Sequence, residues 1–220
     1  PKMIQQAANL IKNSKKPILY VGGGIIHSKA NKELFDLATK FNIPVVTTLM
    51  GRGAFPDGHE LCLEMPGMHG NYTATTSIQK SDLLIAIGVR FDDRVTANPS
   101  FFAQNAKVIH ADIDPAEIGK VREAQVPIVG DAKSVILGLI DALQDEELDT
   151  KNWINELNSM KTEHPLSYNQ DENGPLKVPF VLEELQDLTE EGAIVVSGVG
   201  QHQMWISQHW NFTEPNTWLN

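Results

Sequence analysis

Five short segments of the chain are rich in apolar residues, and between them apolar residues recur at helical spacing. The short segments cover residues 17–24, 43–48, 83–87, 107–114 and 126–130. Runs of this length predict strands that are buried on both faces, as in a parallel sheet covered by helices. The segment 83–87 is the clearest, because Gly88 ends it and a cluster of charged residues follows at once.

Helical spacing is clearest at the start of the chain, where the apolar residues of 3–12 share one face. Similar spacing occurs in residues 30–41 and 72–79, and Asp131 is placed to cap a further helix. Strands that alternate with helices form a doubly wound, mostly parallel sheet with helices on both faces. We therefore predict an α/β fold of the Rossmann-like kind for the first part of the chain.

A change in composition divides the chain after residue 150. An acidic stretch ends there, residues 151–160 have apolar residues at helical spacing, and a polar, turn-rich stretch follows from His164 to Pro175. Beyond it, the pattern predicts an amphipathic helix, a strand at 192–198 and a helix at 201–210, which together resemble the first βα unit of a second α/β domain. We predict a first domain at 1–150, a linker at 151–177 and a truncated second domain at 178–220. Because the chain begins without methionine and the second domain is so short, we expect a fragment of a longer protein.

Charge and composition exclude several classes of function. The formal net charge of −10 and the pI near 5.1 argue against a nucleic acid or an anionic membrane surface as partner. No apolar run approaches the roughly 20 residues that span a bilayer. The single cysteine, Cys62, has no internal disulfide partner, and no spacing of His or Cys resembles a zinc site. We expect the cytoplasm, or an organelle matrix in a eukaryote.

The candidate chemistry lies directly after the predicted strands. Ligands of open α/β sheets bind beyond the carboxyl ends of the strands, and Arg90 and Arg94 follow the strand 83–87. Two arginines four residues apart suit a diphosphate, although a surface cluster of salt bridges explains the same spacing. The other candidates each have an ordinary alternative: a tight turn for the glycines at 22–24, a surface histidine for His69, and a helix cap for Asp131.

Several motifs occur together in one order, and the combination is far more specific than its parts. The motifs are TLMGRGAFP at 48–56, PGMHG at 66–70, VRFDDRVT at 89–96, DIDPAEI at 112–118 and VGQHQMW at 199–205. With these motifs the whole chain resembles the large, catalytic subunit of acetolactate synthase, a family of thiamine-diphosphate enzymes. The resemblance covers the middle domain of that family and the beginning of its carboxyl-terminal domain.

The resemblance implies decarboxylation of pyruvate and ligation of the two-carbon unit to a second 2-oxo acid, in branched-chain amino-acid synthesis. It also implies that the middle domain holds FAD, which takes no net redox part in the synthesis. By position, the residues that match the FAD contacts of the family are Gly23, Thr48, Leu49, Gly67, Met68, His69, Gly88, Val89, Arg90, Phe91, Asp92, Asp93, Arg94, Asp112, Ile113, Asp131 and Ala132. Gln201 and His202 match positions near thiamine diphosphate, at a helix N-terminus suited to an anion.

The chain also departs from the family pattern. Pro66 replaces a more usual aliphatic residue, and Ala97 stands where the family often has glycine. No residue matches the catalytic glutamate or the Mg²⁺ ligands of the family, so we expect the chain alone to be inactive as a carboligase.

The resemblance implies a parent that is at least a homodimer, with a regulatory subunit as a further partner. Two alternatives stay open: another thiamine-diphosphate enzyme of the glyoxylate carboligase or pyruvate oxidase type, and a scaffold domain that binds no nucleotide.

Overall fold

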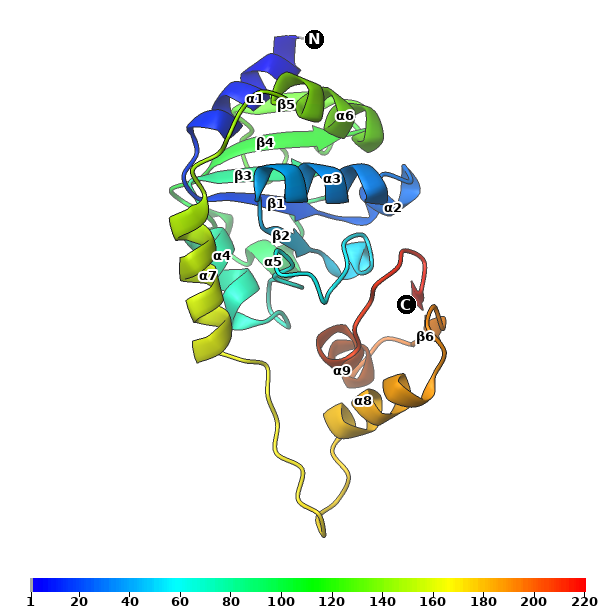
Figure 1. Cartoon of the computed structure of the whole chain (residues 1–220). Coiled ribbons are helices and arrows are strands. Elements are labelled where there is room, and N and C mark those ends of the chain that lie inside the picture. Colours follow the sequence, from blue (N-terminus) through cyan, green and yellow to red (C-terminus); the bar gives the residue numbers. More distant parts are fainter. Residues whose placement is uncertain (1) are drawn as a thin grey trace.

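The computed structural model describes residues 2–220, and its centre is a five-stranded sheet (Figure 1). All five strands are parallel, and their order across the sheet is β2-β1-β3-β4-β5. The strands are β1 (Pro17–Val21), β2 (Val45–Thr47), β3 (Leu83–Ile87), β4 (Lys107–Asp112) and β5 (Val126–Val129). The predicted α/β fold with a parallel sheet is thus confirmed, and β3 has the bounds that the apolar run predicted.

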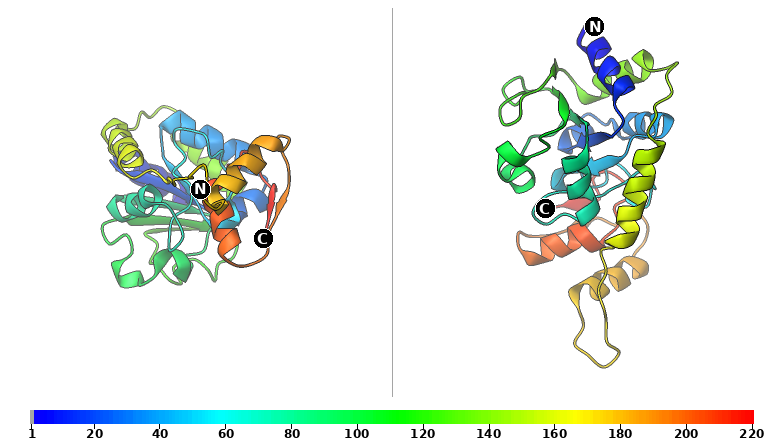
Figure 2. Two further views of the ribbon diagram at one scale, coloured as in Figure 1. Left: turned by 90° about the horizontal axis from the view of Figure 1, so that it is seen from below. Right: turned by 90° about the vertical axis from the view of Figure 1, so that its left-hand side faces the viewer.

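Helices cover both faces of the sheet. On one face lie α1 (Lys2–Asn13), α2 (Gly23–His27), α3 (Asn31–Phe41) and α6 (Ala132–Ala142). On the other face lie α4 (Tyr72–Lys80) and α7 (Lys151–Glu163), beside the short segments α5 (Asp93–Thr96) and η2 (Pro99–Phe101). In the right-hand view of Figure 2, α7 stands beside α4, and the chain then loops away before it returns as α8.

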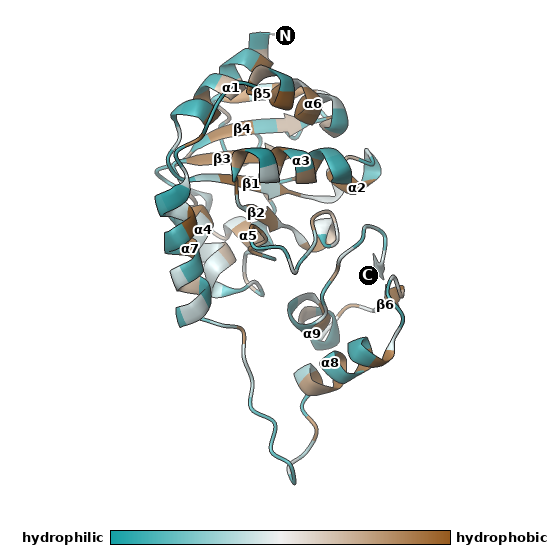
Figure 3. Cartoon of the chain, in the orientation of Figure 1, coloured by the Kyte–Doolittle hydropathy of each residue, from teal (hydrophilic) through white to brown (hydrophobic). Residues whose placement is uncertain are grey.

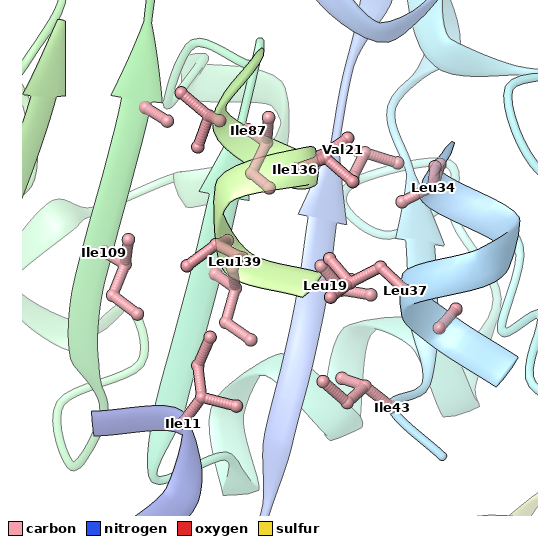
Figure 4. Close-up of a cluster of buried hydrophobic side chains, with 14 of the residues drawn as sticks. Ile11, Leu19, Val21, Leu34, Leu37, Ile43, Ile87, Ile109, Ile136 and Leu139 are labelled. Carbon is pink, nitrogen blue, oxygen red and sulfur yellow. The ribbon is translucent and has the colours of Figure 1, made fainter. Parts of the chain in front are cut away.

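The hydropathy pattern explains this arrangement. The strands are mostly apolar, with polar residues in β4, while the helices of both layers are hydrophilic on their outer surfaces (Figure 3). On the first face, Ile11, Leu37, Ile136 and Leu139 project onto the strands and are 0% exposed (Figure 4). Burial of each such side chain stabilises the fold by about 1.5–3 kcal/mol. The buried cluster on each face therefore holds the helices of that layer to the sheet.

Trp153 joins α7 to the other face of the sheet. Its indole is 1% exposed, and its Nε1 donates a hydrogen bond of 3.1 Å to the Pro17 carbonyl oxygen. Leu157 and Met160 are buried in the same cluster. The helical part of the segment predicted as a linker therefore packs on the sheet, whereas residues 164–177 form the extended connection to the last part of the chain.

The C-terminal unit, residues 178–220, is small. It contains α8 (Val178–Leu188), β6 (Val195–Val196), α9 (Gln201–His209) and β7 (Trp218–Leu219). The strands β6 and β7 pair in parallel on either side of α9, and the core of the unit is formed by Ile206, Phe212 and Trp218. β6 is shorter than the predicted strand at 192–198, and the pattern of apolar residues did not predict β7 or α2.

Candidate functional site

The segments that leave the five strands form one continuous row, which we call the rim: residues 22–24, 48–52, 88–94, 112–113 and 130–131. Because the strands are parallel, their carboxyl ends meet at the same edge of the sheet. Backbone hydrogen bonds of 2.8–3.0 Å link neighbouring exits, from N–H to carbonyl oxygen: Thr48 to Val21, Gly24 to Gly88, Gly88 to Ala111, and Gly130 to Asp112. The row spans four strand spacings, about 19 Å at 4.7–4.9 Å each.

The chain adds β2 on one side of β1 and then adds β3 on the other side, so β1 and β3 flank a topological switch point. The rim is most tightly packed there. A Cβ added to Gly24 would lie 2.5 Å from the Gly88 Cα, and one added to Gly22 would lie 2.7 Å from the Gly88 oxygen. Gly88 itself has φ +57°, which favours glycine. In folds with this strand order, ligands bind at such a switch point.

The glycines at 22–24 do not form the tight turn that was their ordinary alternative. In the structure α2 begins at Gly23, and Gly22 and Gly24 are needed for contact with Gly88. Gly23 takes no part in that contact, and its Cβ position faces Met50 instead.

Side chains alternate in direction along the run from Gly88 to Arg94. Val89 and Phe91 are 3% and 4% exposed, so their side chains belong to the core, and only their backbone is available to a ligand. Arg90 is exposed and makes no ion pair with any residue of 2–220. Arg94 has one loose, exposed pair with Asp93 at 3.7 Å. Such exposed pairs contribute little, so both guanidinium groups are available to an anion.

His110, on β4, supports this run from below. It is fully buried, its Nε2 lies 3.0 Å from the Val89 carbonyl oxygen, and its ring meets Phe91 edge-on at 5.1 Å. Burial lowers the pKa of His110, and the hydrogen bond to Val89 opposes this shift. The ring is therefore neutral near pH 7, with Nε2–H as the donor to Val89.

We expect the stability of wild-type protein to fall more steeply on acidification than that of His110→Phe. A lowered folded-state pKa gives stability that is present above the ordinary pKa of 6.5 and lost as the pH falls below it. Burial raises the pKa of Asp57 to about 6, which acts in the opposite direction, so the comparison must be between variants. Urea unfolding at about pH 7.5 and about pH 5.5 measures the free energy of unfolding of both proteins. If both lose the same free energy between these pH values, the burial of a neutral histidine is contradicted.

The loop at 67–69 is held against the run after β3. Met68 N–H donates to the Arg94 carbonyl oxygen at 2.8 Å, and Gly67 has φ +101° with its Cβ position 2.6 Å from the same oxygen. His69 is exposed, and its carbonyl oxygen accepts a hydrogen bond of 2.8 Å from Gln208 on α9. The structure thus brings the Gly-Met-His loop and the arginines together, which the motifs alone did not predict.

The two outer parts of the rim are less distinctive. The Asp131 carboxylate caps α6 by accepting from the Ser134 amide at 3.1 Å, and Asp112 accepts from the Asp114 amide at 2.9 Å. Ala132 is buried in the first turn of α6, and Leu49 packs partly against the C-terminal unit. For Asp131 the cap that was the ordinary alternative is therefore present in the structure.

Apolar side chains are exposed at the rim and in the loop beside it. Met50 and Ile113, on the rim, are 59% and 73% exposed, and Met68, in the loop at 67–69, is 64% exposed. Aromatic ring systems bind on apolar side chains of this kind, and anionic groups bind to guanidinium. The rim therefore has the chemistry for a ligand that combines flat rings with phosphate.

The remaining candidates lie elsewhere. Gln201 and His202 are exposed in the first turn of α9, on the C-terminal unit, and neither has a hydrogen bond to the rim among the described residues. A cavity of about 290 Å³ is lined by Cys62, Lys161 and residues around them, and no predicted site residue lines it. Cys62 is buried, and burial raises its pKa to about 12, so its thiol is unreactive.

No cluster of residues suited to a metal ion occurs within 2–220, and no helix of this part of the chain is long and apolar enough to cross a membrane. The sequence patterns did not predict that Met50 is exposed on the rim, or that Arg52 and Asp57 form a buried ion pair. These three residues lie in an irregular stretch, where no periodicity separates buried from exposed positions. The glycine-rich motif after a strand was the one feature of this stretch that indicated a site.

Comparison with known proteins identifies the family of this chain. Residues 4–139 match the family described as thiamine pyrophosphate enzyme, central domain. The acetolactate synthase of Mycobacterium leprae (strain TN) is 52% identical over 100% of this chain and 36% of its own length. The acetolactate synthase large subunit of Corynebacterium glutamicum is 49% identical over 100% and 36%. Acetolactate synthase 1, chloroplastic, of Nicotiana tabacum is 44% identical over 99% and 33%.

The chain spans about a third of the length of these curated relatives. The family match itself covers well over half of the chain and includes all five strands of the sheet and most of α6. The chain therefore belongs to the thiamine pyrophosphate enzyme family and contains its central domain.

Proposed function

We propose that this chain is the flavin-binding part of an acetolactate synthase. The complete enzyme would decarboxylate pyruvate and join the two-carbon unit to a second 2-oxo acid, as a step in branched-chain amino-acid synthesis. Relatives from bacteria and plants that are named acetolactate synthase align with nearly the whole of this chain, which supports this activity. The residues of the rim support a flavin-binding role for the chain within that enzyme.

The observation that carries the proposal is the pair of free arginines beside exposed apolar side chains at the switch point. In the proposed complex, Arg90 and Arg94 bind the diphosphate of FAD, since guanidinium matches phosphate geometry. Met50, Met68 and Ile113 contact the flat rings, and Asp92 and Asp112 bind ligand hydroxyls.

The assignment of parts follows from the same proposal. Residues 1–150 would form the FAD-binding middle domain, 151–177 the linker, and 178–220 the start of the domain that binds thiamine diphosphate. Gln201 and His202 would lie near that second cofactor, whose Mg²⁺ ligands would belong to other parts of the enzyme. The proposed partners are a second catalytic subunit and a regulatory subunit, in the cytoplasm or an organelle matrix.

We expect Arg90→Ala to raise the dissociation constant for FAD by about 10–100-fold, since a hydrogen bond to a charged group contributes about 1.5–3 kcal/mol. FAD titration followed by flavin fluorescence measures this change. Lys107→Ala is the matched control, because Lys107 is an exposed cation at the opposite end of the neighbouring strand β4. Equal affinity of Arg90→Ala and wild type would remove the arginine from the site, and a wild type indifferent to FAD would favour a scaffold domain.

A further inference from the structure

The C-terminal unit contacts the sheet domain at few points, and most of them involve the stretch 52–57. Asp57 and Phe212 exchange two hydrogen bonds: the Asp57 N–H donates to the Phe212 oxygen at 3.1 Å, and the Phe212 N–H donates to Asp57 Oδ2 at 2.6 Å. A Cβ added to Gly53 would lie 2.2 Å from the Glu214 oxygen, so the two backbones are in direct contact. A further hydrogen bond joins the Gln208 side chain to the His69 carbonyl oxygen.

Asp57 owes its position to Arg52. The guanidinium donates two hydrogen bonds to the carboxylate, from Nη1 to Oδ1 at 2.8 Å and from Nη2 to Oδ2 at 2.7 Å. The side chains are only 2% and 1% exposed, and the guanidinium lies 5.6 Å from the centre of the Phe212 ring. Two buried charges in this bidentate arrangement depend on each other, because either one alone would be left desolvated without a partner.

The same pair also adjoins the rim. Arg52 follows the short helix η1 (Leu49–Gly51), and its N–H donates to the Leu49 oxygen at 3.4 Å. Leu49 packs against the core of the C-terminal unit, and Met50 is one of the exposed apolar residues of the rim. Anything that moves Arg52 therefore moves the exit of β2 and the docking surface for Phe212 together.

We propose that Arg52 and Asp57 are positioning residues, which hold the C-terminal unit on the rim and so fix α9 relative to the loop at 67–69. The docking itself follows from the contacts above. Its consequence for catalysis rests on the proposed function, in which α9 carries residues near thiamine diphosphate and the loop contacts the flavin. The pair would then keep the sites of the two cofactors in register.

Backbone amide exchange tests the docking directly, because the Asp57 and Phe212 amides are the donors that join the two units. In Arg52→Met and in Asp57→Asn, we expect both amides to exchange about 100-fold faster or more, since one buried charge loses its partner. The amides of β3 should stay within about threefold of wild type, because β1 lies between β3 and β2, the strand that the stretch 52–57 follows.

The double variant Arg52→Met, Asp57→Asn separates the ion pair from simple loss of packing. It contains no buried charge, and the new asparagine can still accept from the Phe212 amide. We expect it to exchange within about tenfold of wild type, since replacing both members of a buried pair costs much less than removing one. A double variant as impaired as the single ones would overturn the proposal, as would unchanged exchange in the single variants or equal acceleration in β3.

FAD affinity measured on the same proteins gives the second arm. We expect each single variant to raise the dissociation constant several-fold through the displaced exit of β2, and the double variant to restore it. Undocked single variants that bind FAD as wild type does would overturn the effect of the pair on the rim. If wild-type chain binds no FAD, the proposed function fails, and amide exchange alone decides whether the pair positions the C-terminal unit.

Discussion

Trp153→Ala should lower the free energy of unfolding of the sheet domain by about 3–5 kcal/mol, the usual cost of truncating a fully buried tryptophan. Trp153 is 1% exposed, and its indole N–H is bonded to the first residue of β1. The variant leaves a large cavity between α7 and the sheet and removes the hydrogen bond to the Pro17 carbonyl oxygen. The loss would be a large part of the 5–15 kcal/mol that stabilises a typical domain.

Urea unfolding followed by circular dichroism measures this change. Trp210→Ala is a suitable control, because Trp210 is half-buried and belongs to the C-terminal unit. It should leave the unfolding of the sheet domain nearly unchanged. A loss below about 1 kcal/mol in Trp153→Ala would show that α7 adds little to the sheet domain and behaves as part of a linker.

Gly88→Ala should both destabilise the protein and abolish measurable FAD binding at concentrations that saturate wild type. A residue with a side chain at φ +57° is strained by about 1–2 kcal/mol. The new Cβ would in addition lie 2.7 Å from the Gly24 Cα, and overpacking of this kind costs about 1–3 kcal/mol. To relieve the contact, β1 and β3 must separate where the proposed diphosphate site lies.

Gly119→Ala is the matched control for backbone strain. Gly119 has φ +76°, but its Cβ position has nothing within 4 Å, so only the strain is introduced. We expect Gly119→Ala to retain FAD affinity and to lose less stability than Gly88→Ala. If the two variants behave alike in urea unfolding and FAD titration, then close contact between the glycines at the switch point has no special role.

The strands were predictable because buried strands consist of consecutive apolar residues. Leu83 to Ile87 are all apolar, and Asp82 before them and Gly88 after them leave little choice of bounds. The position of Arg90 and Arg94 at the carboxyl edge then followed from the rule that parallel strands end together. The alternation that buries Val89 and Phe91 has the period of extended chain, but the charges between them drew attention to the run as a binding site.

The docking of the C-terminal unit was not predictable in the same way. Arg52 and Asp57 are charged residues in an irregular loop, a combination that normally predicts exposure. They are buried because Phe212, 155 residues from Asp57 along the chain, covers them. No local pattern contains that information. β7 escaped prediction for a related reason, since two residues define no periodicity.

In the proposed function, the exits of the parallel strands form one site for a flavin nucleotide. A crystal structure of this chain grown with FAD tests this arrangement. We expect continuous density along the rim, with the diphosphate between Arg90 and Arg94 and the ligand reaching from Gly23 toward Asp112. FAD bound in the cavity beside Cys62 and Lys161, or no bound FAD under saturating conditions, would contradict it.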